Sequence, residues 1–259
     1  MRIALGVEYD GRDFHGWQRQ RHVRSVQACI EQGLSKVANQ PVSTVCAGRT
    51  DARVHALAQV VHFDTQAQRN EHSWVLGANS NLPDDASILW AREVDDSFHA
   101  RFSATGRSYR YVILNRLARP AALRGRVTWQ PLRLDEVEMA SAAQLLLGKH
   151  DFSAFRASGC QANSPVRTLR ELNVTRHGEY VVLQTSANGF LQHMVRNIAG
   201  VLMAIGLHKQ PAQWATQVLQ SRDRRCGGVT ASPHGLYLTA VQYPERFDFP
   251  VLSPSIGLW

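Results

Sequence analysis

The 259-residue chain is poor in cysteine and has no long apolar run. Its four cysteines stand far apart and form no C-x-x-C pair, which argues against a structural zinc site and against a disulfide framework, and favours a reducing compartment. No stretch approaches the roughly 18 continuous apolar residues of a membrane helix. Charge follows the first strand-like residues at Glu8, too soon for a signal peptide. The sequence therefore predicts a cytoplasmic protein without a membrane anchor.

The chain also has few lysines and an excess of positive charge. Only three of the 29 basic residues are lysine, and the formal net charge is +8. This charge fits a polyphosphate partner. Arginine suits bidentate phosphate contacts, although genome base composition could produce the same bias. Two arginine groups are candidates to face RNA, with a solvated loop surface as the alternative for both: Arg116, Arg119, Arg124, Arg126 and Arg133, and Arg222, Arg224 and Arg225.

Hydrophobic periodicity predicts a mixture of helices and largely antiparallel strands. No residue-level repeat and no Pro-, Ser- or Gly-rich linker divides the chain, but element order suggests an α+β protein of two α/β sandwich halves, residues 1–106 and 107–259, with sheets meeting across a cleft. Strands are expected at 3–9, 59–63, 88–94, 108–114, 169–175, 180–185 and 236–242, and helices at 26–37, 74–78, 136–147, 190–205 and 211–219.

The segment 47–56, AGRTDARVHA, places one carboxylate between two arginines without a helical period. Guanidinium groups beside Asp51 would keep it ionised, and an ionised carboxylate can act as a nucleophile or a base. An Asx-type turn between two strands is the structural alternative. The triplet Arg49-Thr50-Asp51 alone does not decide between them.

The segment resembles the G-R-T-D-x-G-V-H-A signature of the tRNA pseudouridine synthases of the TruA family. Residues 9–20, YDGRDFHGWQRQ, are similar to the family's Y-D-G-x-x-F-x-G-W-Q-x-Q. The later blocks FHARF (98–102), RSYRY (107–111), HDF (150–152), NGFLQHMVRN (188–197) and GLYL (235–238) follow in the family's order. Several ordered blocks are a far stronger signal than any one short motif.

The resemblance implies the pseudouridine synthase fold and the isomerisation of uridine to pseudouridine at positions 38, 39 and 40 of the tRNA anticodon arm. It implies that Asp51 is the nucleophile, that Arg49 assists base flipping and that Arg196 pairs with Asp51. Tyr109 would stack on the flipped base, since RNA-binding proteins commonly hold unstacked bases on aromatic rings, with Tyr111 as support or core.

Further substrate-binding residues implied by the resemblance are His55, His193 and Asn188. No H-x-x-x-H or carboxylate spacing supports a metal site, and the reaction requires no redox or phosphate energy, so no metal and no cofactor are expected. Related enzymes are homodimers that bind one tRNA across both subunits, which predicts a homodimer here. Residues 190–205 are expected to form a helix with an apolar stripe and a polar face that carries Gln192, His193, Arg196 and Asn197.

One position departs from the family pattern. Arg53 stands where the family usually has Gly, two residues after Asp51. If that position has a positive φ, Arg costs on the order of 1 kcal/mol or more, since a Cβ disfavours this region. Two other functions remain: a noncatalytic RNA-binding protein on the same fold, and a glycosidase, which would need a second acid such as Asp151.

Overall fold

The computed structural model describes residues 1–250, which form two compact units. Of the described residues, the first unit comprises Met1–Thr105 together with residues 237–250, and the second comprises Gly106–Leu236. Residues 251–259, the end of the half predicted at 107–259, lie outside the described residues. Both units combine helices with strands, so the protein is of the mixed α+β class.

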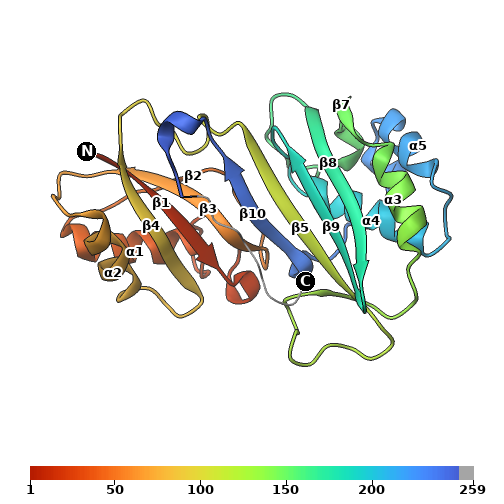
Figure 1. Cartoon of the computed structure of the whole chain (residues 1–259), viewed down its shortest axis with the longest axis horizontal. Coiled ribbons are helices and arrows are strands. Elements are labelled where there is room, and N and C mark those ends of the chain that lie inside the picture. The colour runs from red at the N-terminus through yellow and green to blue at the C-terminus, as the bar shows by residue number, and fades with distance from the viewer. Residues whose placement is uncertain (251–259) are drawn as a thin grey trace. The chain divides into compact units, whose positions relative to one another are not determined.

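The first unit is a sheet with strand order β4-β1-β3-β10, accompanied by two helices (Figure 1). Its elements are β1 (Arg2–Tyr9), α1 (Val26–Ala38), β2 (Val45–Cys46), β3 (His55–Asp64), α2 (Glu71–Asn79), β4 (Ala86–Val94) and β10 (Leu236–Gln242). β1 pairs antiparallel with both β3 and β4, and β2 forms a short antiparallel pair with β3. The predicted strands and helices of residues 3–94 are therefore confirmed, each extended by a few residues.

The last strand corrects the predicted division of the chain. β10 pairs in parallel with β3, with Tyr237 opposite His55, so it completes the first sheet although the sequence placed it in the second half. Local pattern identifies a strand but not its hydrogen-bonding partner, because that partner lies about 180 residues earlier. Strands from near both ends of the described chain, β1 and β10, therefore flank β3 in the first sheet.

A cluster of aromatic side chains packs against this sheet. Phe98 is fully buried and packs edge-on against Phe247 and Phe249. Trp90 of β4 stacks on Phe249 at 5.0 Å, and its indole occupies the space above Gly6, where a Cβ would lie 2.0 Å from the indole nitrogen. Gly6 is therefore required by close packing between β1 and β4.

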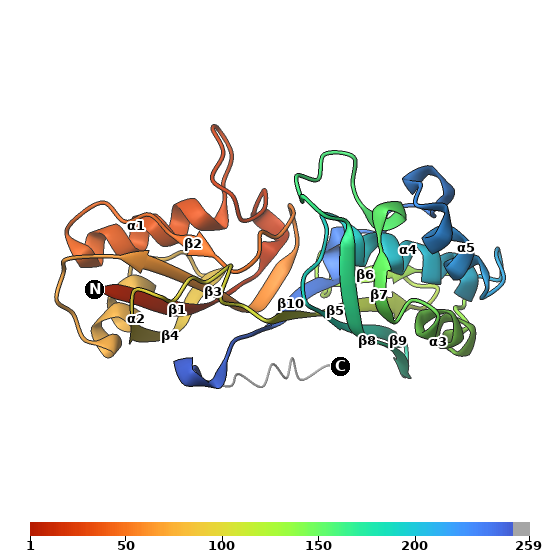
Figure 2. The same ribbon diagram turned by 90° about the horizontal axis from the view of Figure 1, so that it is seen from above.

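The second unit has the sheet order β5-β9-β8-β7, with α3, α4 and α5 together on one side of it (Figures 1 and 2). Its elements are β5 (Gly106–Asn115), β6 (Thr128–Gln130), α3 (Glu136–Gln144), β7 (Gly148–Asp151), β8 (Val166–His177), β9 (Tyr180–Ala187), α4 (Met194–Gly206) and α5 (Trp214–Ser221). The β8–β9 pair is the hairpin that the sequence predicts, with Gly178 at φ +59° in its turn.

Helix ends are where the sequence predictions were wrong in this unit. α4 begins at Met194 and not at residue 190, because His193 adopts a left-handed conformation at φ 62°. α5 begins at Trp214, so Pro211 precedes the helix instead of occupying its first turn. α3 is capped by Asp135 as expected, but it ends at Gln144, and Gly148, at φ +102°, opens β7.

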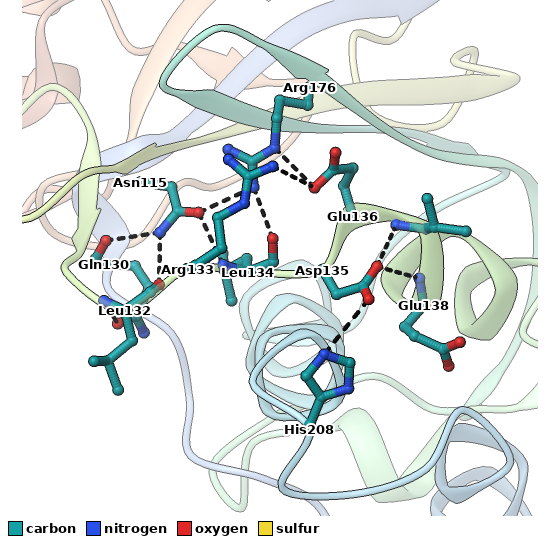
Figure 3. A network of polar contacts seen from close by, with 11 residues as sticks. Asn115, Gln130, Leu132, Arg133, Leu134, Asp135, Glu136, Glu138, Arg176 and His208 are labelled. Atoms are coloured by element: carbon teal, nitrogen blue, oxygen red, sulfur yellow. Dashed lines mark hydrogen bonds and ion pairs between the residues drawn. The ribbon is translucent and has the colours of Figure 1, made fainter.

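A polar network ties α3 to the sheet (Figure 3). Arg176 at the end of β8 donates from Nε to Glu136 Oε2 at 2.7 Å and from Nη2 to Asn115 Oδ1 at 3.0 Å and to the Leu134 carbonyl at 2.8 Å. This side chain is 11% exposed. Because a charge so far removed from water needs partners, the network fixes the entry to α3.

Candidate active site

The first group of predicted site residues lies on the loop that enters β3. Residues 47–54 connect β2 to His55, with Arg49 exposed and Asp51 half-buried. This is the loop position that the sequence predicts for the catalytic segment. Inside the loop, the carbonyl of Asp51 accepts a hydrogen bond from the Val54 amide at 3.2 Å.

The N-terminal motif, residues 9–20, holds this loop. Tyr9 Oη lies 2.8 Å from Thr50 Oγ1, and the Trp17 amide donates to the Thr50 carbonyl at 3.0 Å. On the other side of Asp51, the Arg53 amide donates to the Phe14 carbonyl at 3.1 Å. The backbone of Asp51 is therefore fixed on both sides, which suits the precise placement that its predicted role requires.

Two glycines of the same motif make this contact possible. A Cβ on Gly11 would lie 2.0 Å from the Val54 carbonyl oxygen. Gly16 has φ +93°, and a Cβ there would lie 2.8 Å from the carbonyl oxygen of Thr50. Both positions need glycine because the two backbones touch directly.

Arg53 adopts φ 66°, the left-handed region that favours glycine. The strain expected for an arginine at this position is therefore present, on the order of 1 kcal/mol. Its side chain is exposed.

His55 lies beneath the loop. Its ring is 2% exposed, stacks on Tyr237 at 4.5 Å and places Nδ1 3.1 Å from the Gly11 amide nitrogen and 3.2 Å from Asp10 Oδ1. Burial raises the pKa of Asp10, but hydrogen bonds from His55 and Arg12 outweigh this effect and hold that pKa well below its ordinary value. These contacts make His55 a support of the loop, and its contact with substrate stays a prediction.

The second group lies in the second unit, around the start of β5. Tyr109 is half-buried, and its ring meets Phe190 edge-on with centroids 5.0 Å apart. Tyr111, two residues further, is fully buried and donates from Oη to the Ser232 carbonyl at 2.8 Å. Burial raises the pKa of Tyr111. The structure therefore gives Tyr111 the core position that the sequence predicts.

Arg196 lies in the first turn of α4. Its Nε donates to the Ala231 carbonyl at 2.9 Å, and the Ala231 amide donates back to the Arg196 carbonyl at 3.1 Å. Asn197 does not share an open polar face with it, because Asn197 is buried and donates to the Phe155 carbonyl. His193 and Gln192 precede the helix, so the predicted polar face contains only Arg196 from this set.

Asn188 is exposed in the turn after β9, but its side chain binds the backbone. Asn188 Oδ1 accepts from the Thr168 backbone amide at 2.9 Å, and the Asn188 backbone amide donates to the Thr168 carbonyl at 3.2 Å. This pair fixes the loop 188–192 against the start of β8. Its geometry makes Asn188 a positioning residue for that loop.

A sequence model of the tRNA pseudouridine synthase family matches residues 6–103 and 142–244. The chain belongs to that family. It is 60% identical over 259 residues to tRNA pseudouridine synthase A of Nitrosococcus oceani, with 100% of both chains covered. Identity is 56% with the enzymes of the same name from Alcanivorax borkumensis, covering 100% of this chain and 97% of that one, and Shewanella amazonensis, covering 98% and 97%.

Membership makes this protein an isomerase, as the sequence resemblance indicates. Among solved structures, a Cbf5–Nop10–Gar1 complex aligns with 91% of this chain and 57% of that chain, at 10% identity and a TM-score of 0.35.

Family membership does not decide which arginines face a ligand, and the structure separates them. Arg224 points inward, donating from Nη2 to Asn197 Oδ1 at 3.1 Å and to Thr230 Oγ1 at 2.9 Å. Arg225 pairs with Asp223 at 2.6 Å. In the segment 222–225, Arg224 is therefore held by side-chain contacts and Arg225 by an ion pair. The orientation of this segment toward RNA stays a prediction.

Two residues of the Asp51 loop's support are not predicted by the sequence. Gln59, fully buried in β3, donates from Nε2 to the Gly48 carbonyl at 2.6 Å, and Tyr9 reaches Thr50 from β1. A polar residue within the apolar run of β3 was the available signal for Gln59. Nothing in the sequence around Tyr9 indicates its partner, because 41 residues separate the two.

Asp151, the acid considered for a glycosidase, serves a turn. Its Oδ1 accepts from the Ser153 amide at 2.9 Å and Oδ2 lies 3.7 Å from Arg222. Within residues 1–250, no group of three or more His, Cys, Asp or Glu side chains is arranged to hold a metal ion. No helix in this range is long and apolar enough to cross a membrane.

Proposed function

We propose that this enzyme converts uridine to pseudouridine at positions 38, 39 and 40 in the anticodon arm of tRNA. The observation that carries the proposal is the Asp51 loop: a half-buried carboxylate whose neighbours on both sides are hydrogen-bonded to the N-terminal motif. The tRNA pseudouridine synthase A of Nitrosococcus oceani aligns with this chain over the full length of both.

In this reaction the N1–C1′ bond of uridine breaks and a C5–C1′ bond forms. The proton on C5 passes to solvent, and N1 gains one. Asp51 is the nucleophile or base that begins the exchange, by attack on the sugar or on the base or by removal of a sugar proton. No redox partner or nucleotide enters this balance, so the enzyme works without a cofactor.

The target base must leave its stack before it can turn over. Arg49 is exposed on the same loop, two residues before Asp51, where a guanidinium can enter the vacated space. Tyr109, supported edge-on by Phe190, offers a ring for the displaced uracil. Such stacking contributes about 1–3 kcal/mol per base.

Arg196 is assigned to pair with Asp51. Its Nε donates to the Ala231 carbonyl, which orients the guanidinium. A guanidinium is suited to a bidentate pair with a carboxylate. The assignment also requires the two units to come together across a catalytic cleft, as in the pseudouridine synthase fold. His193 at the left-handed turn before α4 is assigned to contact the RNA there. The assembly is proposed to be a cytoplasmic homodimer that binds one tRNA across both subunits.

The deciding experiment measures tritium release from tRNA that carries 5-tritiated uridine, with no added metal or nucleotide. Wild type is expected to release tritium, whereas Asp51→Asn should release none and still bind tRNA, because one carboxylate supplies the chemistry and many arginines supply the affinity. Asp51→Asn with the wild-type rate contradicts the assignment. Release of free uracil instead would identify a glycosidase.

The second candidate function is a noncatalytic tRNA-binding protein. The strained Arg53 favours it, because an altered loop backbone can misplace Asp51. Wild type that binds tRNA and releases no tritium would establish this alternative.

A further inference from the structure

Three arginines converge on the loop 188–192 of the second unit. Arg107 at the start of β5 has Nη1 3.4 Å from the Asn188 carbonyl oxygen. Arg167 at the start of β8 places Nε 3.6 Å from where a Cβ on Gly189 would lie. Arg156 stands on a segment that is joined to the same loop by the bond from the Ala157 amide to the Gln192 carbonyl at 3.0 Å.

Carboxylates do not neutralise two of these side chains. Within residues 1–250, Arg156 donates to the Cys160 carbonyl, and Arg167 donates to the carbonyls of Ser164 and Val166; neither lies within ion-pair distance of Asp or Glu. By contrast, Arg176 in the same unit has Glu136, and Arg225 has Asp223. Uncompensated like charges held together by main-chain contacts are costly unless an anion completes them.

The local electrostatics agree with this geometry. Burial lowers the pKa of Arg167. The charge of Cys160 raises it and the charges of Arg156 and Arg107 lower it, so that this pKa lies below its ordinary value. Burial raises the pKa of the Cys160 thiol, but amides of Ala162 and Gln192 and the charge of Arg156 outweigh it, so that pKa lies below its ordinary value. Both effects indicate a positive potential at this place.

We propose that Arg156 and Arg167, together with Arg107, form a binding site for a phosphodiester of the RNA substrate. Arg107 and Tyr109 lie two residues apart on β5 and so share a face of that strand, which places this phosphate beside the proposed base-stacking ring. The site rests on the proposed function for its ligand and specifies where the backbone of the flipped nucleotide is held. We call these three side chains the arginine cradle.

The first test measures the affinity for an anticodon stem-loop RNA over a series of salt concentrations. Arg156→Gln and Arg167→Gln should each weaken binding severalfold and reduce the slope of log K against log salt by about 0.7–0.9, the contribution of one phosphate contact. Arg156→Lys and Arg167→Lys retain the charge and should keep the slope. Arg69→Gln, an exposed arginine of the first unit bonded to the Gln68 carbonyl, is the matched control and should also keep it.

Unchanged slopes in both Gln variants, or an equal loss in Arg69→Gln, would overturn the cradle. A loss shared by the Lys variants would do so as well, because it would show damage to the loop and not loss of a charge. This result is separable from the proposed function: a wild type that isomerises uridine with unchanged variant slopes refutes only the cradle. A wild type with the expected slopes and no tritium release refutes only the isomerase.

Cys160 provides a local probe of the same site. Its alkylation by iodoacetamide, followed in the peptide by mass spectrometry, should slow when the stem-loop RNA is bound. Protection by inorganic phosphate without protection by RNA would assign the cradle to a free anion and contradict the proposal. Absence of protection by RNA at saturating concentration would also contradict it.

Discussion

Tyr9 Oη lies 2.8 Å from Thr50 Oγ1, so the residue that precedes Asp51 is tied to the end of the first strand. Both side chains are buried, and an uncompensated hydroxyl there would cost about 1–3 kcal/mol. Through this contact the N-terminal motif, residues 9–20, supports the segment that carries Asp51. The geometry of the Asp51 loop is consequently set in part by a contact between two buried side chains.

Gly16→Ala should abolish activity by displacing this loop. The new Cβ would meet the Thr50 carbonyl oxygen at 2.8 Å, and φ +93° is strained for alanine. Gly178→Ala is the matched control, since Gly178 also has a positive φ, +59°, but nothing lies within 4 Å of its Cβ position. Both variants should lose about 1 kcal/mol or more of stability in urea unfolding. Equal tritium release by the two would show that the close approach at Gly16 is dispensable.

Arg53→Gly should stabilise the protein by about 0.5–1 kcal/mol, because it removes a Cβ from a residue at φ 66°. The higher entropy of glycine in the unfolded chain offsets part of the relieved strain. The melting temperature should rise by about 1–4 °C. Asn39→Gly, at φ 52° after α1, is the comparison and should change little, since asparagine tolerates this region. Tritium release above that of wild type would show that the arginine slows turnover. A lower melting temperature would mean that the Arg53 side chain makes a contact worth more than the strain.

Sequence motifs predicted the loop position of Asp51, the core position of Tyr111 and the β8–β9 hairpin, because each depends on neighbours within a few residues. The partner of β10 and the contact between Tyr9 and Thr50 depend on residues 41 or more positions away, which periodicity does not encode. Arg224 shows the same limit for charge. Its inward orientation depends on Asn197 and Thr230, and a charge count cannot distinguish it from an RNA-facing arginine.

The early start predicted for α4 has a different cause. Apolar spacing continues back through Phe190, but the backbone turns at His193 with φ 62°. Phe190 is thereby free of the helix and packs on Tyr109. Because the apolar pattern continues past the true start of the helix, the sequence did not reveal that Phe190 packs against Tyr109.

Tyr109→Ala should lower kcat/KM for tRNA by about 10- to 100-fold, the equivalent of one lost stacking interaction of about 1–3 kcal/mol. Tyr109→Phe keeps the ring and its edge-on contact with Phe190, so it should retain most of the wild-type kcat/KM. The measurement is initial-rate tritium release at several tRNA concentrations. If Phe and Ala variants lose the same activity, the hydroxyl and not the ring makes the contribution.

Glu136→Gln should destabilise the second unit by about 1–3 kcal/mol while leaving tritium release unchanged. Arg176 is 11% exposed and would lose the carboxylate that accepts its Nε–H at 2.7 Å (Figure 3). Glu179→Gln is the control, because its pair with Arg116 is exposed and should contribute at most about 1 kcal/mol. Urea unfolding compares them. Equal loss in the two variants would show that burial of Arg176 adds nothing to the pair.

His62 should make the first unit less stable as the pH falls from 6.5 to 4. Burial, with the charges of Arg2 and His99, lowers the pKa of His62 to about 4, whereas the unfolded chain takes up a proton near its ordinary value of 6.5. Between these two pH values the unfolded state binds the proton that the folded state does not. The stability that the neutral ring provides is therefore complete above pH 6.5 and is lost progressively below it, by up to about 1.4 kcal/mol per pH unit.

His62→Gln tests this loss directly. Glutamine keeps an oxygen for the Ala100 amide, which donates to His62 Nδ1 at 3.1 Å, but it does not titrate. In urea unfolding between pH 4.5 and 7.5, the advantage of wild type over His62→Gln should therefore shrink toward acid pH. His72→Gln, at an exposed histidine of α2, should follow wild type throughout. A constant difference between wild type and His62→Gln across this range would mean that His62 accepts its proton in the folded protein as readily as in the unfolded chain.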